Sequence, residues 1–473
     1  MEIEEYLEIV SGQIRSKRAR IMAVKEIEDH IKDQAGAYEE EGMKQETAME
    51  EAVRQMGDPV TTGVELDRIH RPKMDWKLFW WIVLFSALGL AIQYLCFYRL
   101  GNMEGQFQIP MESSMIKFVR QCVYTAVGLV VMAGICLCDY SLIGKYGEIW
   151  AGVFLAGIWA ACSPGILPRL NGSYPYLKCI LYLFIPLYGG ILYRNRGNRY
   201  KGLMISALWI AAVFLTGIKV IGGGLGVLID TMAACFFMLL VAAWEDWFQV
   251  SKKMGLGFGA TILIIPGIIF FSNNLTGYQI ERLKVWLHPE QYATGAGYQV
   301  TTIRNIVSNL GINTSCYKAL EQKGLLEFVS ACADHYEYMM LQAAVTLGTV
   351  KVIFLGILFT AFLFYLFRMA AKEKNKLGHM IALGCTMLLA VQTIQNMMYN
   401  FGIGIISTSG VPFFSYGRVL TLVLYILFGV LLSIYRYQNL VWDEPIKNIR
   451  KSGELAKLTH YILRGERNEN TLS

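Results

Sequence analysis

The stretch Trp286–Gly348 contains WLHP at residues 286–289, TGAGYQ at residues 294–299 and DHYE at residues 334–337. Apolar segments of membrane length flank this stretch on both sides. Carboxylates placed just where a chain re-enters a bilayer are costly, and such a placement usually has a functional cause. We therefore expect this polar stretch to hold the functional site of a membrane protein.

The composition of the whole chain is that of a membrane protein. Of its 473 residues, 54% are hydrophobic and 17% are charged, whereas soluble proteins have about 25% charged residues. The apolar residues come in runs of about 17–25, which are long enough to cross a bilayer as helices. The first 75 residues are too polar to contain a cleavable signal peptide. We expect an all-α, polytopic membrane protein with about ten transmembrane helices.

Lys and Arg in the short loops predict the orientation of these helices. The expected spans lie near 78–98, 118–138, 146–163, 177–193, 203–219, 225–245, 256–272, 338–367, 379–400 and 418–436. Basic residues concentrate after the fourth, sixth and eighth spans and after the tenth. Because such loops remain cytoplasmic, both termini are expected in the cytoplasm and the loop 273–337 outside the cell.

Charge and periodicity divide the chain into three parts. Residues 1–75 have a net charge of −7 and a helical pattern of apolar residues, which predicts a small cytosolic helical domain whose third helix ends at Gly57-Asp58-Pro59. The membrane domain covers residues 76–437, and a basic cytosolic tail covers residues 438–473. The positive charge of the rest of the chain fits cytoplasmic loops, so nucleic-acid binding is not expected.

The ten cysteines predict no metal site. They are scattered, mostly within apolar segments, and no CxxC pair occurs. Most are expected to be buried and chemically silent. Cys316 and Cys332 both fall in the long loop, where a disulfide between them would require an external location.

Several motifs together resemble those of the SEDS family (shape, elongation, division and sporulation proteins), whose members include FtsW, RodA and SpoVE. The likeness covers about residues 78–437. The motifs that carry it are Arg120-Gln121, Asp139-Tyr140, LHP at 287–289, GAGYQ at 295–299, HYE at 335–337, NFG at 400–402, TSGVP at 408–412 and FSYG at 414–417. The N-terminal domain is similar to the helical domain that precedes some permeases and FtsW-like proteins of Gram-positive bacteria, on the residues Asp29-His30-Ile31, Ala48, Ala52 and 56–59.

Four departures from the family pattern identify a divergent member. Gly223-Gly224 stands where the family has Pro-Asp, and Gly417-Arg418 stands where it has Gly-Gly. Residues 305–323 replace a Gly-rich run, and Glu337 replaces the family's presumed catalytic Asp.

The resemblance implies a peptidoglycan glycosyltransferase of the bacterial plasma membrane. Such enzymes polymerise lipid II, a polyprenyl-linked disaccharide, at the outer membrane face during division, elongation or sporulation. It also implies a class B penicillin-binding protein as partner. The resemblance implies no specific cofactor and leaves open whether a divalent cation takes part. Two other readings remain: a non-catalytic scaffold of the cell-wall machinery, and a flippase for the lipid-linked precursor.

The acidic motif supplies the candidate base for this reaction. Glu337 is the first choice and Asp334 the second, three residues earlier. A carboxylate near the outer membrane edge can accept the proton of the acceptor hydroxyl. The alternative is a solvated helix start, where acidic residues interact favourably with the helix dipole. His335 matches a family His that would orient the carboxylate or contact substrate, unless it is an ordinary interfacial histidine.

The remaining candidates are substrate-binding residues. Arg120, Lys117 and Lys178 would hold the pyrophosphate, or else they anchor helix ends at the interface. Gly295 and Gly297 allow a close backbone approach and Gln299 offers an amide to sugar hydroxyls, unless the glycines form an ordinary turn. Ser415 and Tyr416 would close one wall of the cavity or form a buried structural turn.

Overall fold

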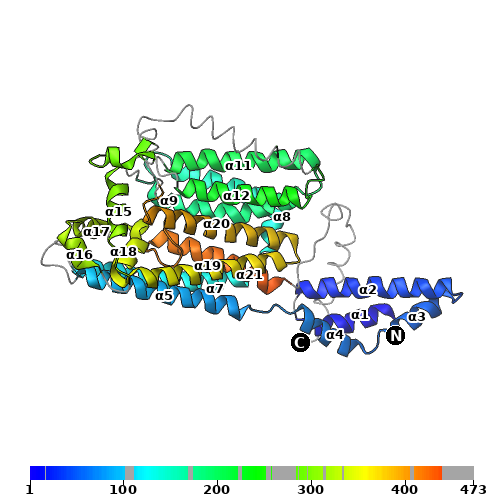
Figure 1. Ribbon diagram of the computed structural model, residues 1–473. Helices are drawn as coiled ribbons and strands as arrows, with labels where there is room; N and C mark the ends of the chain where they lie inside the picture. The colour runs from blue at the N-terminus through cyan, green and yellow to red at the C-terminus, as the bar shows by residue number, and fades with distance from the viewer. Residues whose placement is uncertain are drawn as a thin grey trace. The chain divides into compact units, whose positions relative to one another are not determined.

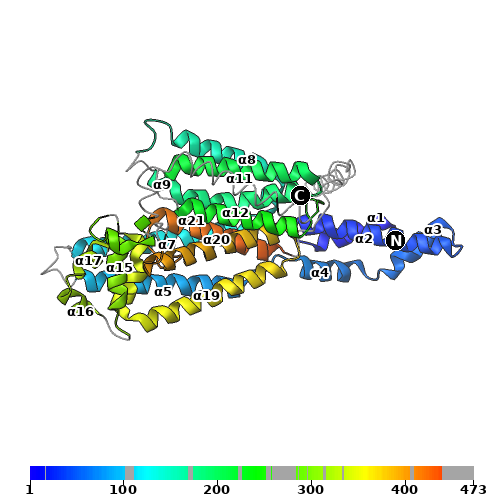
Figure 2. The ribbon, with the colours of Figure 1, turned by 45° about the horizontal axis from the view of Figure 1, so that its top comes forward.

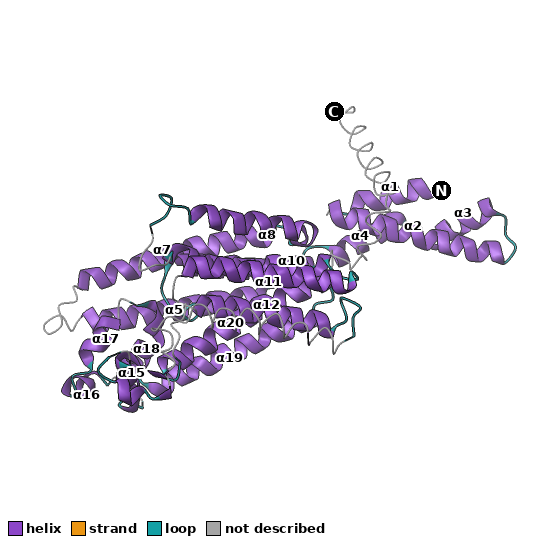
Figure 3. Cartoon of the chain, turned by 90° about the horizontal axis from the view of Figure 1, so that it is seen from above, coloured by secondary structure: helices purple, strands orange, loops and turns teal. Residues whose placement is uncertain are grey.

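The computed structural model describes residues 1–15, 17–101, 111–168, 174–221, 226–251, 257, 284–285, 287–295, 297–312, 316–332, 335–404 and 410–438. Every regular element within these residues is a helix (Figure 3). The chain divides into two compact units, one formed by Met1–Met74 with Tyr435–Ser473 and the other by Asp75–Ile434.

Four helices are described within Met1–Met74: α1 (Ile3–Gln13), α2 (Lys17–Glu40), α3 (Gln45–Gln55) and α4 (Pro59–His70). Their apolar faces bury Tyr6, Val10 and Ile31 completely. Helix α3 ends just before Gly57-Asp58-Pro59, where the sequence predicted the end of the third helix, and α4 follows as a fourth helix that was not predicted. Asp58 caps α4 by accepting the backbone N–H of Thr61, and Pro59 occupies the first helical position.

The second unit is a helical bundle (Figure 1), and the described residues include eight helices long and apolar enough to cross a membrane. They are α5 (Trp76–Gly101), α7 (Met111–Leu137), the broken helix α9–η1–α10 (Pro175–Arg194), α11 (Arg199–Ile221), α12 (Gly226–Trp244), α19 (Thr349–Lys372), α20 (Lys376–Asn400) and α21 (Arg418–Tyr437). The predicted span 146–163 forms α8 (Ser141–Ala161), which is not among the eight. The predicted span 256–272 lies almost wholly outside the described residues. These helices confirm the expectation of an all-α, polytopic membrane protein.

Helix α20 lies at the centre of this bundle. It packs against α10, α12 and α19, of which α12 and α19 are labelled next to it in Figure 2, and 78% of the residues in its most apolar stretch are buried. The corresponding value for α7 is 22%, so α7 presents most of its surface to the surroundings. Polar side chains on α20 therefore face protein rather than lipid.

Among the predicted spans that the structure describes, the fourth and the eighth are not continuous α-helices. The fourth contains a 3₁₀ segment, η1 (Cys179–Leu183), between α9 (Pro175–Lys178) and α10 (Phe184–Arg194). The predicted span 338–367 is divided at Gly348, which has φ +94° and separates α18 (Met339–Leu347) from α19. Because such a φ suits glycine and not other residues, Gly348 ends α18 and the membrane-length helix begins at Thr349.

A small helical layer covers one end of the bundle, which we call the loop end (Figure 1). It consists of η2 (Pro289–Tyr292), α15 (Tyr298–Ser308), α16 (Tyr317–Gln322) and α17 (Leu326–Cys332). Ile306, Leu320 and Val329 form its core with Tyr338 and Val345. Cys316 is a buried free thiol, so the structure does not contain the Cys316–Cys332 disulfide considered from the sequence.

Candidate active site

The turn that carries Glu337 is fastened to α20 by two asparagine side chains. Glu337 lies in the 3₁₀ turn η3 (Tyr336–Tyr338), directly before α18. Its backbone carbonyl accepts hydrogen bonds from the amide nitrogens of Asn396 (3.1 Å) and Asn400 (2.9 Å). The amide oxygen of Asn400 accepts the backbone N–H of Leu341 (3.0 Å) in the first turn of α18. The main chain at Glu337 is thus held in place, while its side chain is only partly buried.

The residues on either side of Glu337 differ in their surroundings. Tyr338 is buried, and its hydroxyl lies 2.8 Å from that of Tyr399 on α20. His335 is exposed, and its ring meets that of Tyr338 edge-on at 6.3 Å. Asp334, the second candidate base, lies outside the described residues.

Three buried glutamines from three helices hold the backbone of the loop 410–417. Gln93 on α5 donates to the carbonyl of Phe414 at 3.0 Å. Gln392 on α20 donates to the carbonyl of Gly410 at 2.9 Å. Gln121 on α7 accepts the N–H of Gly417 at 3.0 Å and donates to Thr421 at 2.9 Å. The exposed fractions of the three glutamines are 0%, 2% and 4% respectively.

This loop enters the bundle and does not lie on its surface. Gln392 is eight residues before the end of α20, which places the carbonyl of Gly410 about 12 Å below that end. A Cβ atom at Gly89, near the middle of α5, would overlap the carbonyl oxygen of Phe413. Irregular backbone at membrane depth is tolerated only where protein buries it or where it lines a cavity. The loop 410–417 meets the first condition, because protein surrounds it and three buried glutamines bond to its backbone.

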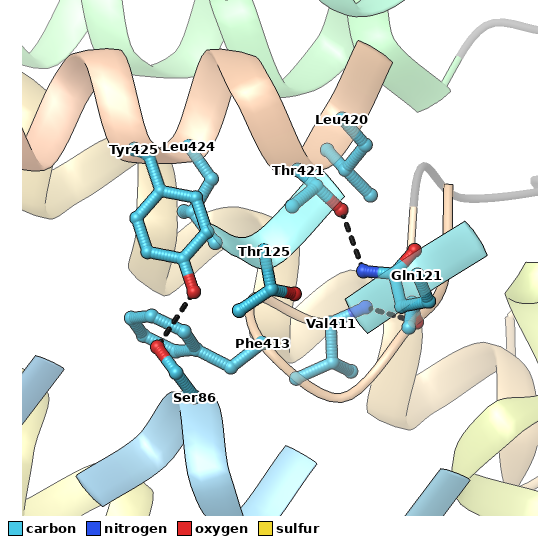
Figure 4. A pocket seen from close by; sticks show the side chains of 10 residues that line it. Ser86, Gln121, Thr125, Val411, Phe413, Leu420, Thr421, Leu424 and Tyr425 are labelled. Atoms are coloured by element: carbon cyan, nitrogen blue, oxygen red, sulfur yellow. Dashed lines mark hydrogen bonds between the residues drawn. The ribbon is translucent and has the colours of Figure 1, made fainter. Parts of the chain in front are cut away.

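The loop also lines a small polar cavity of about 10 Å³ (Figure 4). The volume corresponds to a single water molecule. The hydroxyls of Ser86 and Tyr425 lie 2.6 Å apart on one side, and Gln121 bonds to Thr421 on the other. The cavity is too small for a sugar, so it belongs to the support of the loop.

Ser415 and Tyr416, expected either to close one wall of the substrate cavity or to form a buried structural turn, have different surroundings. Ser415 is 4% exposed, and its hydroxyl accepts the backbone N–H of Val411 at 2.8 Å. This bond makes Ser415 part of the turn itself. Tyr416 is partly exposed, with its ring 5.5 Å from that of Phe97 on α5.

The candidate cations belong to segments that meet this loop. Arg120 is exposed and Lys117 partly buried in the early turns of α7, and Gln121 beside them holds Gly417. Lys178 is partly buried at the end of α9. Two residues before it, the ring of Tyr176 lies 4.6 Å from the guanidinium of Arg418, at the start of α21.

The glycine motif forms a tight turn before α15. The N–H groups of Gly295 and Gly297 both donate to the carbonyl of Tyr292 at 3.0 Å. A Cβ at Gly297 would lie 2.8 Å from that same oxygen, so the turn itself requires glycine there. Gln299 is exposed in the first turn of α15. The helix is tied to the end of α20 because Arg304 donates to the carbonyl of Gly402 at 2.9 Å.

Each predicted group within the described residues is therefore connected, directly or through a neighbouring residue, to the segments 392–404 and 410–418. Sequence reasoning missed Gln392 and Asn396, and it used Asn400 only as part of a motif. Their spacing of four residues puts all three on one face of α20. Polar residues repeated at this spacing within an apolar span were the signal that would have identified them.

Two further polar residues are buried within the helices. Asp230 on α12 is fully buried and accepts a hydrogen bond of 2.6 Å from the hydroxyl of Tyr182 in η1. Gln342 on α18 is 1% exposed, and its amide has no hydrogen-bond partner within the described part of the chain. Among the same residues, no group of three or more His, Cys, Asp or Glu side chains is placed to hold a metal ion.

Comparison with known proteins identifies the family. The FtsW/RodA/SpoVE family, described as "Cell cycle protein", matches residues 175–440. A probable peptidoglycan glycosyltransferase FtsW of Trichlorobacter lovleyi is 22% identical over 326 residues, covering 67% of this chain and 82% of that protein. Stage V sporulation protein E of Bacillus subtilis is 22% identical over 377 residues, covering 76% and 97%.

A solved structure shares the fold. It comes from work described as "Structural coordination of polymerization and crosslinking by a peptidoglycan synthase complex". It aligns with 77% of this chain and 98% of its own, with a TM-score of 0.57 and 18% identity. The family match covers more than half of the chain and confirms the resemblance that its motifs predicted. This multi-pass membrane protein belongs to the FtsW/RodA/SpoVE family.

Proposed function

We propose that this protein is a peptidoglycan glycosyltransferase that polymerises lipid II at the outer face of the bacterial plasma membrane. The relatives named above as glycosyltransferases support the reaction class. The observation that carries the proposal for this chain is the fixed position of Glu337, beside a loop held within the membrane bundle. Both the turn and the loop are fastened to one face of α20.

Glu337 is the general base in this proposal. Its carboxylate takes the proton from a sugar hydroxyl of the acceptor while that oxygen bonds to the anomeric carbon of the donor. The bond from the anomeric carbon to the polyprenyl pyrophosphate breaks, and the pyrophosphate leaves with the bonding electrons. Asp334 is the alternative base, and His335 orients the carboxylate or contacts the sugar.

The leaving group requires positive charge. Arg120, Lys117 and Lys178 serve this role, since guanidinium and ammonium groups bind phosphate oxygens. Gln299, the turn at Gly295 and Gly297, and the turn at Ser415 and Tyr416 complete the walls. No step assigned here requires a metal ion, and a divalent cation on the pyrophosphate would add to the same charge stabilisation.

This function sets the orientation of the chain. The loop end faces outward and both termini lie in the cytoplasm, with the helical domain 1–75 and the tail 438–473 on the cytoplasmic side. A class B penicillin-binding protein is the proposed partner that cross-links the new glycan.

Glycan polymerisation from lipid II by the purified protein, with and without a candidate transpeptidase partner, tests the proposal. Wild type is compared with Glu337→Gln and Asp334→Asn. We expect polymer from wild type and from Asp334→Asn, and none from Glu337→Gln. Loss in Asp334→Asn alone would transfer the base role to Asp334. A wild type that makes no polymer under either condition would favour the scaffold or flippase reading.

A further inference from the structure

We propose that Asn396 and Asn400 are positioning residues for Glu337, and that together they form a clamp that sets where its carboxylate stands. The clamp is defined by the two amide nitrogens that converge on the carbonyl oxygen of Glu337. The inference rests on the proposed function, because it gives the clamp a catalytic purpose only if Glu337 is the base.

The clamp is well suited to fix a short segment. A carbonyl oxygen has two lone pairs, and here both hydrogen bonds come from side chains of a single helix. Asn396 is 0% and Asn400 is 3% exposed. The two hydrogen bonds are partly buried, and such bonds are stronger than fully exposed ones because the local dielectric constant is lower.

The segment that carries Glu337 is a single short turn. The turn η3 contains three residues, and its own backbone bond joins the N–H of Tyr338 to the carbonyl of His335 at 3.2 Å. Short 3₁₀ turns have poor hydrogen-bond geometry. The distance from Glu337 to a substrate hydroxyl therefore depends on α20, and a misplacement of about 1 Å costs roughly 100-fold in rate.

The clamp makes more hydrogen bonds than capping of α18 requires. Capping of α18 at Leu341 uses only the amide oxygen of Asn400. The amide nitrogens of both asparagines also lie within hydrogen-bond distance of the carbonyl of Glu337, the residue that we propose as the base, and that of Asn400 lies as close to the backbone and side-chain oxygens of Asn396 (2.9 and 2.8 Å). Polar side chains inside a membrane-length helix cost free energy and usually have a function. Asn396 and Asn400 lie on the face of α20 that contacts η3.

Two substitutions separate the clamp from the cap. Asn400→Asp keeps an oxygen for the N–H of Leu341 and removes the N–H donors to Glu337 and to Asn396. Asn396→Leu removes the second donor at similar volume. Asn375→Asp is the matched control, because Asn375 caps the opposite end of the same helix by accepting the N–H of Gly378 at 3.0 Å, a bond that Asp also makes.

Initial rates of lipid II polymerisation by the full-length variants test the clamp, together with amide hydrogen exchange at residues 336–341. We expect kcat to fall about 10–100-fold in each clamp variant. KM should remain within about twofold of wild type because the uniform binding of substrate is untouched. Exchange at residues 336–341 should accelerate, and Asn375→Asp should keep the wild-type rate.

Two results would overturn the clamp alone: wild-type kcat despite faster exchange, or a parallel loss of kcat, substrate affinity and thermal stability, which marks a structural role. A wild type without polymerase activity is a different result. It would remove the proposed function, and the catalytic role of the clamp with it.

Discussion

Gly89 shows how a single residue admits the loop 410–417 into the bundle. It is buried near the middle of α5, and a Cβ there would overlap the carbonyl oxygen of Phe413. The obstacle is backbone, so no side-chain rotation relieves it. The close approach of helix and loop therefore depends on glycine at this position.

Gly89→Ala should destabilise the protein by about 1–3 kcal/mol, the usual cost of overpacking a well-packed site. Thermal unfolding of the purified protein measures the effect. Gly134→Ala is the control, since Gly134 lies within α7 and a Cβ there would meet nothing within 4 Å. Equal melting temperatures for the two variants would contradict the described position of the loop.

The residues of the candidate site differ in how far the sequence could predict their surroundings. The glycine turn at 295–297 and the acidic motif at 334–337 were visible as motifs. The hydrogen bonds of Gln121 and Ser415 could not be predicted. Gln121 bonds to a residue about 300 positions away along the chain, and the bond of Ser415 depends on the conformation of its own turn. A motif indicates residue types, whereas tertiary packing decides which polar atom meets which.

Helix α20 is the element that organises the site. Gln392, Asn396 and Asn400 follow one another at four-residue spacing, and their amides hold the loop 410–417 and the turn η3. The sequence predicted the helix from its apolar residues. Its polar face was overlooked because three amides among so many apolar residues hardly alter the mean hydropathy of the span.

Gln392→Leu should loosen the loop and cost about 1 kcal/mol, the net contribution of a typical hydrogen bond. Polymerisation and thermal stability should both decrease. Gln395→Leu, on the same helix, should keep both, because the amide oxygen of Gln395 is buried without a hydrogen-bond partner in the described part of the chain. If Gln395→Leu were the more harmful change, the assignment of Gln392 as a support of the loop would be wrong.

Helix α4 depends on its first residues. The hydroxyl and the backbone N–H of Thr61 donate to the carboxylate of Asp58, and these bonds lower its pKa. A carboxylate with a lowered pKa stabilises the fold above its unfolded pKa of about 3.9, and this contribution is lost as the pH falls through the folded-state pKa.

Asp58→Ala should therefore accelerate amide exchange at residues 59–70 at neutral pH. Asp58→Asn should retain most of the protection, because Asn is also a good N-cap, and its contribution should not change with acidification. The comparison uses the full-length protein. Unchanged exchange in Asp58→Ala would show that tertiary packing alone holds α4.

At the scale of the whole molecule, composition and apolar runs were sufficient to predict an all-α, polytopic protein. Composition and apolar runs did not predict where the helices are interrupted. The apolar pattern continues across Gly348 and through η1, so the change of backbone conformation at these points leaves no mark on hydropathy. The helix α4 was missed for the opposite reason, since its weak apolar pattern hid a clear Asp-Pro start signal.

Our main proposal is that Glu337 is the base of a lipid II polymerase. The most direct test is the initial rate of lipid II consumption by the purified wild type and by Glu337→Gln, assayed with the same candidate transpeptidase partner. We expect polymer from wild type and a rate at least about 100-fold lower for Glu337→Gln, the range expected for loss of a general base. Equal rates for the two proteins would contradict it.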